Sequence, residues 1–213
     1  MEKGLLITRP NYDDVTEYLS IYSKKIISKA KEKGLNVFDL KGSSINMETF
    51  NDILKKLDYN FIVFNCHGNP ETIFGHKNST LIKLGQNNNT LFGRIIYARS
   101  CDVGQKLGKS MKEDKKGCFI GYKFKFKFCI DETRISSPQS DNTAKIFLNP
   151  SNMIPKSLIK GNSAIEAQDK SKKQIAKNMK KIIQKGGPRS YLEVLWNNLS
   201  GMVLYGNENA KIN

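Results

Sequence analysis

Two short apolar runs, residues 61–66 and 95–97, constrain the fold of this chain more than any other feature. Continuous apolar runs of this kind between polar turns are typical of strands buried on both faces of a parallel sheet. Segments with helical spacing of apolar residues lie between the strand-like runs of the first half of the chain. This alternation predicts an α/β fold with a mostly parallel sheet and right-handed crossovers.

The remaining elements follow from turn residues and periodicity. Further strands are expected at residues 5–8, 35–40, 117–121 and 202–205, and short β-like pieces at 72–74 and 80–82. Asn11 is expected to cap a first helix that Gly34 ends, and a second helix runs to about Leu57. A capping box at residues 163–166 opens a long helix, and a last helix covers residues 191–199.

Three segments have less regular patterns. Val103, Leu107 and Met111 are four residues apart, which predicts a helix that begins at Cys101. Residues 122–128 alternate aromatic side chains with lysines, as on an edge strand with one buried face. Residues 131–155 lack clear periodicity, and we expect a long irregular loop there with only a short helix at 144–148.

Composition limits the class of protein. The 213 residues suit a single domain spanning residues 1–213, and a hydrophobic share of 38% is ordinary for a globular chain. No apolar run is long enough to cross a membrane, and the first residues do not resemble a signal peptide. The four cysteines lie in or beside apolar strand-like runs. We therefore expect a cytoplasmic protein with reduced thiols and no membrane partner.

The net charge of +15 is compatible with a nucleic-acid partner. However, the lysines are spread over helices and turns, and no aromatic or arginine-rich recognition motif accompanies them. Charge alone governs mainly solubility and nonspecific contacts, so we do not expect nucleic acid to be the main partner.

A histidine and a cysteine mark the ends of two successive strands. His67 and Gly68 follow the run 61–66, and Cys101 follows the run 95–97. Because parallel strands end at one edge of the sheet, where α/β proteins bind ligands, we expect His67 and Cys101 side by side. A helix start would help the thiol of Cys101 to ionise, and His67 could protonate a leaving amine. The N–H groups of Gly68 and Cys101 would form an oxyanion hole.

Other interpretations of these residues remain open. Cys101 could be a small core residue and His67 a turn residue, because cysteine is among the most buried residue types. A metal site is not predicted, since Cys66 and His67 are adjacent and would point to opposite faces of a strand. The chain has no C-x-x-C or H-x-x-H pair and no glycine-rich phosphate-binding fingerprint, so we expect no cofactor.

Taken together, these motifs resemble those of the caspase-like (clan CD) cysteine peptidases, most of all their CHAT-domain branch. The pair His67-Gly68 ends one strand and Cys101 ends the next, at an interval shorter than in the caspases, and residues 99–104 fit in part the Ser-Ala-Cys-x-x-Gly pattern of that branch. Residues 117–121, 161–167 and 204–207 are similar to later pieces of such domains. The caspase signature Gln-Ala-Cys-x-Gly itself is not met.

The resemblance implies a caspase-like three-layer α/β/α sandwich and a thiol protease, a hydrolase that cleaves peptide bonds with a His67/Cys101 dyad. It also implies an effector endopeptidase that acts on a protein or peptide substrate. A regulatory partner on another chain would control it. Two alternatives remain: a caspase-fold scaffold that binds without catalysis, and a basic nucleic-acid-binding protein.

The resemblance further implies a substrate pocket at Arg99. In caspase-like enzymes the side chain two positions before the nucleophile lines the pocket for the residue that precedes the scissile bond, and strand alternation turns Arg99 to the face of Cys101. A guanidinium grips a carboxylate through two hydrogen bonds, which predicts cleavage after Asp or Glu. Three alternatives remain for this pocket. Asp102 could neutralise Arg99, or the pocket wall could come from Arg134 or Asp141. Arg99 could also be a surface ion-pair partner.

Overall fold

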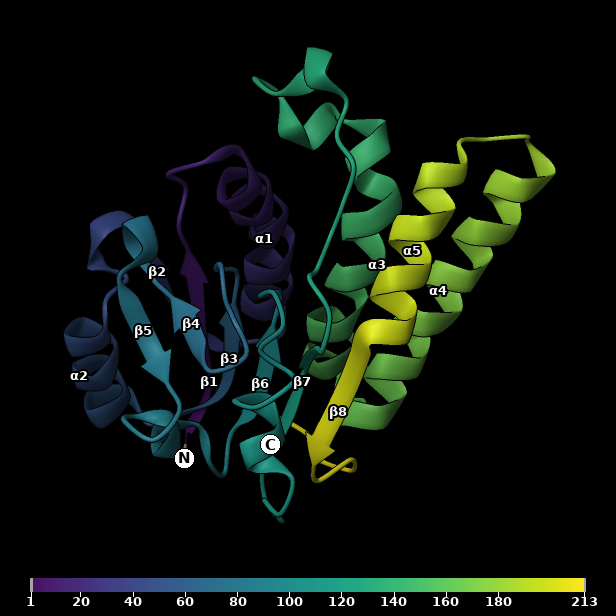
Figure 1. Ribbon diagram of the computed structural model, residues 1–213. Helices are drawn as coiled ribbons and strands as arrows, with labels where there is room; N and C mark the ends of the chain where they lie inside the picture. Colours follow the sequence, from purple (N-terminus) through teal and green to yellow (C-terminus); the bar gives the residue numbers. More distant parts are fainter. Residues whose placement is uncertain (1, 213) are drawn as a thin grey trace.

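A six-stranded, mostly parallel sheet forms the centre of the protein. The computed structural model describes residues 2–212. Figure 1 shows the strands, which follow the order β2-β1-β3-β6-β7-β8 across the sheet. The first five are parallel to one another, and the last runs antiparallel to β7. Their bounds in chain order are β1 (Glu2–Arg9), β2 (Asn36–Lys41), β3 (Tyr59–Phe64), β6 (Ile95–Ala98), β7 (Cys118–Tyr122) and β8 (Met202–Gly206).

Helices cover both faces of this sheet, and strand alternation decides which side chains meet which layer. Leu5 and Ile7 belong to the core beneath α1 (Asp14–Glu32), α3 (Asn142–Ile159), α4 (Ala164–Gln184) and α5 (Arg189–Gly201). Leu6, between them, joins the core beneath α2 (Met47–Leu57) and the hairpin of β4 (Thr72–Phe74) and β5 (Thr80–Lys83). All three side chains are 0% exposed, so each contributes about 1.5–3 kcal/mol of burial free energy. The expected three-layer α/β/α arrangement is confirmed.

The helix predicted after Cys101 is not formed. Turns follow Cys101 instead. Between Cys101 and β7, the only helical segment is the short 3₁₀ helix η4 (Gly108–Met111). Asp102 has a left-handed backbone with φ of 60°, and the N–H of Gly104 donates to the Tyr122 carbonyl at 2.9 Å. Val103, Leu107 and Met111 are all 0% exposed. Their regular spacing therefore reflects burial of the three side chains in the core and does not indicate a helix.

The predicted edge strand at residues 122–128 is also wrong beyond Tyr122. The chain there is extended but pairs with no strand among residues 2–212, and it climbs along α3 and α5 (Figure 1). Hydrogen bonds from side chains of α5, and not pairing with a strand, fix the position of this segment. Asn198 exchanges two hydrogen bonds with the backbone of Lys127, at 3.1 and 2.6 Å, and Asn197 donates to the Lys125 carbonyl at 2.8 Å.

The irregular loop expected at residues 131–155 ends at Asp141, where α3 begins. Two prolines inside α3, Pro150 and Pro155, hide it from a sequence-based prediction, because proline lacks the N–H that a helix needs. The carbonyl of Ile146, which Pro150 leaves without its helical donor, instead accepts from the Asn178 side chain of α4 at 2.7 Å. Ser171 of α4 donates to the Pro150 carbonyl at 2.9 Å. At Ile146, a side chain of α4 thus replaces the hydrogen bond that the proline removes, and the bond from Ser171 adds a second link between the two helices.

Candidate active site

The candidate site lies at the carboxyl ends of three neighbouring strands. The strand order reverses between β1 and β3, because α1 crosses to β2 on one face and α2 returns to β3 on the other. Ligands of open α/β sheets bind at such switch points. Asp13 follows β1, His67 follows β3 and Cys101 follows β6, so the sheet delivers the three side chains in spatial order.

His67 and Cys101 occupy matching positions beyond their strands. Phe64 pairs with Ala98 in the parallel register, and each functional residue lies three positions beyond its member of that pair. The two loops are in direct contact, since a Cβ on Gly68 would lie 3.0 Å from the Cys101 carbonyl oxygen. Only glycine fits there. The common sheet edge expected for the two residues is therefore observed.

Asp13 orients the imidazole of His67. The distance from His67 Nε2 to Asp13 Oδ2 is 2.7 Å, and the same carboxylate caps α1 by accepting from the Thr16 N–H at 2.8 Å. Burial opposes ionisation of the carboxyl, but the hydrogen bonds from Thr16 and His67 outweigh it and lower the pKa of Asp13. An ionised carboxylate can only accept, so Nε2 carries the proton. In an imidazole that carries one proton, on Nε2, the Nδ1 atom is an acceptor.

Asp13 is a functional residue that the sequence interpretation missed. Asn11 had been expected to cap the first helix, but the cap is Asp13, which forms a capping box with Thr16. Two signals could have identified it: the Asp-x-x-Thr spacing, and its place directly after the first strand of a parallel sheet. Its neighbour Tyr12 packs at 6.1 Å between ring centroids from His67.

The surroundings of the Cys101 thiol favour its protonated form. Burial raises its pKa, and the neighbouring carboxylate of Asp102 adds to the rise, while a contact with the Phe126 carbonyl at 3.9 Å and two nearby lysines oppose it. We had expected a helix start to favour the thiolate. No such helix forms among residues 101–107, so the dipole that would lower the pKa is missing.

The backbone N–H groups of Gly68 and Cys101 are the candidate donors of an oxyanion site. Within residues 2–212, neither the N–H of Gly68 nor that of Cys101 donates a hydrogen bond to the protein. The N–H groups of His67 and Ser100, in the same two loops, likewise have no acceptor among residues 2–212, so the unpaired state alone does not single out Gly68 and Cys101. They are the two donors assigned to the oxyanion hole from the sequence.

Arg99 is buried and does not line an open pocket. Its side chain is 1% exposed, and every guanidinium nitrogen donates to a neutral oxygen of the protein. The acceptors come from the end of β3, from α1 and from α3, and they are Asn65, Ser23, Ser151 and Asn152. The interpretation of Arg99 as a surface ion-pair partner is therefore wrong. A substrate carboxylate could reach it only by displacing these bonds, so the proposed acidic pocket finds no support here.

The other candidate pocket residues are dispersed. Asp102 accepts from Gln105 at 3.4 Å and does not pair with Arg99. Arg134 is exposed on the short helix η5 (Glu132–Arg134), above the sheet edge. Asp141 is 0% exposed and structural, because it caps α3 and accepts from the Tyr18 hydroxyl at 3.0 Å.

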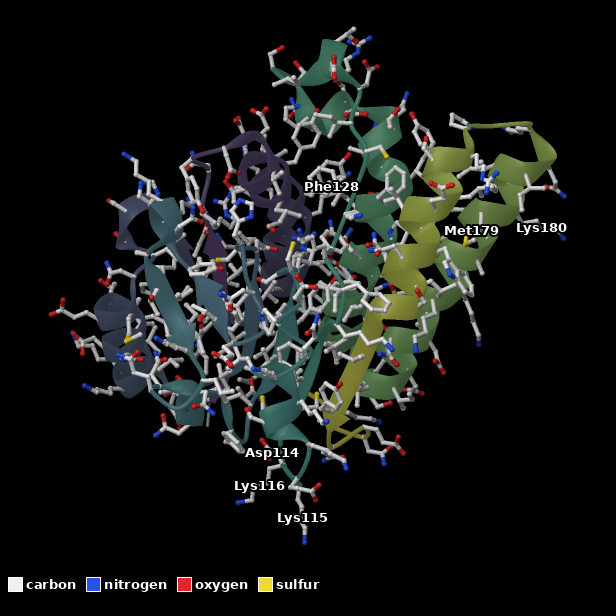
Figure 2. The ribbon with its side chains drawn as sticks, in the orientation of Figure 1. Asp114, Lys115, Lys116, Phe128, Met179 and Lys180 are labelled. Carbon is white, nitrogen blue, oxygen red and sulfur yellow. The ribbon has the colours of Figure 1, made fainter. Side chains whose placement is uncertain are left out.

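An apolar hollow borders the chain segment beside the thiol. Its volume is about 310 Å³, and Phe126, whose carbonyl accepts from Cys101, forms part of its wall. Val15 and Tyr18 of α1 and Val194 of α5 close the other sides. Figure 2 labels Phe128, another wall residue, between α1 and α3. This hollow is a better candidate for a substrate side-chain pocket than Arg99.

Cys66 is excluded as the reactive thiol by its environment. It is 2% exposed, contacts the Thr8 hydroxyl at 3.1 Å, and burial raises its pKa to about 12. Among residues 2–212, no three His, Cys, Asp or Glu side chains are grouped so that they could hold a metal ion. No helix in that range is both long and apolar enough to cross a membrane.

Comparison with known proteins adds no family to this description. No protein-family model matches the chain, and no curated protein matches it.

Proposed function

We propose that this protein is a cysteine endopeptidase of the caspase-like type, with Cys101 as nucleophile and His67 as general base and acid. One observation carries the proposal. Asp13, His67 and Cys101 follow three adjacent strands at a switch point, with the Asp13–His67 hydrogen bond at 2.7 Å and the Gly68 backbone against that of Cys101. A base that is oriented by a third group and stands beside a nucleophile is the general arrangement of nucleophilic catalysis.

The first half of the reaction begins from a neutral pair. His67 Nδ1 takes the proton of the Cys101 thiol as the sulfur attacks the peptide carbonyl carbon. Asp13 stabilises the imidazolium through Nε2, which offsets the raised pKa of the thiol. The oxyanion accepts hydrogen bonds from the N–H groups of Gly68 and Cys101. His67 then protonates the leaving amine, and the peptide bond breaks to leave a thioester.

The second half uses the same groups with water. His67 removes a proton from a water molecule, which attacks the thioester carbonyl. The oxyanion site again holds the negative charge. The proton returns to the sulfur as the carboxylic product leaves, so the enzyme regains its starting state.

A non-catalytic scaffold is the second candidate, and one observation favours it. The Cys101 thiol has a raised pKa and donates to the Phe126 carbonyl, an arrangement that does not by itself produce a thiolate. A scaffold would bind peptides without cutting them. In both cases we propose control by a partner chain and a cytoplasmic location, on the basis of the resemblance and of four free cysteines.

A peptide-library cleavage assay tests the function. Wild-type protein should cut a subset of peptides, and Cys101→Ala and His67→Ala should each abolish cutting while the fold is retained. Cys129→Ala removes a half-exposed thiol that does not itself line the hollow beside Phe126, so it serves as the matched control and should keep full activity. Binding of peptides without cleavage by the wild type would support the scaffold, and activity that survives Cys101→Ala would refute the dyad.

A further inference from the structure

A large cavity lies in the helical layer, and its walls share no residue with the candidate active site. Its volume is about 820 Å³, within the range of small-molecule sites. It opens between α3, α4 and the loop that leads to α5, with one contribution from α1. The Ile146 carbonyl, which Pro150 leaves without a helical donor and Asn178 binds instead, lies in its wall, so this proline of α3 helps to shape it.

The charged side chains that line this cavity are all lysines. They are Lys25, Lys145, Lys156, Lys181 and Lys185, and no Asp or Glu is among the lining residues. The lysines come from separate helices, so the fold, and not a local run of sequence, brings them together. Converging like charges around a concave surface create a positive potential that attracts anions.

A second concavity extends the positive surface. It measures about 480 Å³, shares Lys25 and Lys156 with the first, and adds Lys24, Lys29 and Lys160. Its only acidic lining residue is Glu32, whose carboxylate is already held by Lys29 at 2.6 Å. Burial first, and then the charges of Lys25, Lys160 and Lys29, lower the pKa of Lys156. Burial and neighbouring lysines thus disfavour the charged form of Lys156, and a bound anion would favour it.

The floor of the first cavity is apolar and well ordered. Ile146, Pro150, Met153 and Ile182 supply aliphatic surface. Tyr191 adds an aromatic ring, which stands edge-on to Phe147 at 5.6 Å between centroids. A ligand that fits both features needs several negative charges and a flat, largely apolar part.

We propose that this cavity binds an organic phosphate of the nucleotide class. Its phosphates would lie against the lysines, which act as point-charge donors to phosphate. Its planar ring would lie on the aliphatic floor beside Tyr191. Inorganic phosphate leaves the apolar floor unused, and a polynucleotide would bind mainly through its backbone phosphates along the lysines, whereas a nucleotide uses both the lysines and the floor. This binding is independent of peptidase activity, so the failure of one proposal does not bear on the other.

Calorimetric titration of the 213-residue protein with ATP, inorganic phosphate and a single-stranded oligonucleotide tests the proposal. ATP should bind, and inorganic phosphate should bind at least about tenfold more weakly. Lys156→Gln combined with Lys181→Gln removes one charge from each of two walls, and it should weaken ATP binding by about tenfold or more. The double variant should fold normally, because it relieves repulsion and neither side chain forms an ion pair within residues 2–212.

The matched control is Lys115→Gln with Lys116→Gln. Figure 2 shows both lysines at the tip below the sheet, far from Lys180 on α4. This control should bind ATP as the wild type does. Three results would each overturn the proposal: equal ATP affinity in the Lys156/Lys181 variant, equal affinity for inorganic phosphate and ATP, or an oligonucleotide that binds more tightly than ATP and is lost in the same variant.

Discussion

Replacement of Arg99 by methionine tests the energetic account of the core most directly. The guanidinium is 1% exposed, and its bonds are to neutral groups only. In Arg99→Met, the side-chain oxygens of Asn65 and Asn152 lose their donors inside the protein. Each buried, unsatisfied oxygen costs about 1–3 kcal/mol, so the two together cost about 2–6 kcal/mol.

Two effects reduce this cost. The hydroxyls of Ser23 and Ser151 keep their bonds to the carbonyls of Leu19 and Leu148, at 2.7 and 3.0 Å, and lose little. Removal of the charge also removes its desolvation penalty, which is several kcal/mol for an isolated ion but smaller for a weakly hydrated guanidinium with all its donors bonded. We expect a net loss of roughly 3 kcal/mol in the free energy of unfolding.

Equilibrium unfolding in urea, followed by far-ultraviolet circular dichroism, measures the change. Arg99→Lys should also destabilise the protein, because an ammonium has fewer donors and cannot span the same four acceptors. Arg189→Met is the control: this arginine is 91% exposed and pairs only with Glu193 at 3.2 Å, so its loss should change stability by less than about 0.5 kcal/mol. An Arg99→Met protein as stable as the wild type would show that desolvation cancels the hydrogen bonds, and the account would fail.

Three further predictions concern the candidate site. Gly68→Ala should lower peptidase activity by about a hundredfold, since its Cβ would lie 2.7 Å from Val103 Cγ1 and force the loop away from Cys101; unchanged kcat/KM would contradict this. Alkylation of the native protein, read by mass spectrometry, should label Cys101 and spare Cys66, whose pKa is raised to about 12 by burial; labelling of both would show that the strand opens. Because the pKa of Asp13 is lowered by folding, its carboxylate stabilises the folded state at pH values above the ordinary carboxyl pKa, and this stability is lost as the pH falls through the folded pKa. Asp13→Asn should therefore be less stable than the wild type at neutral pH and lose less stability in acid. If urea unfolding shows parallel pH profiles of stability for the variant and the wild type, Asp13 does not have this role.

The pattern of side chains along the chain determined the strands and the common sheet edge of His67 and Cys101. Continuous apolar runs have few stable arrangements other than buried parallel strands, and parallel strands that follow one another must end at one edge. The capping box at Ser163 was equally readable, because both partners lie within one turn of the helix.

Other features depend on partners that are distant in sequence, and only the tertiary structure decided them. Helix α3 is stable despite its prolines because Asn178 supplies a donor from another helix. Asp13 and His67 are 54 residues apart along the chain, and they meet because β1 lies beside β3. Arg99 is buried because three elements provide neutral acceptors for its donors. The lysine cavity exists because packing brings separate helices together, and no local periodicity encodes which faces will meet.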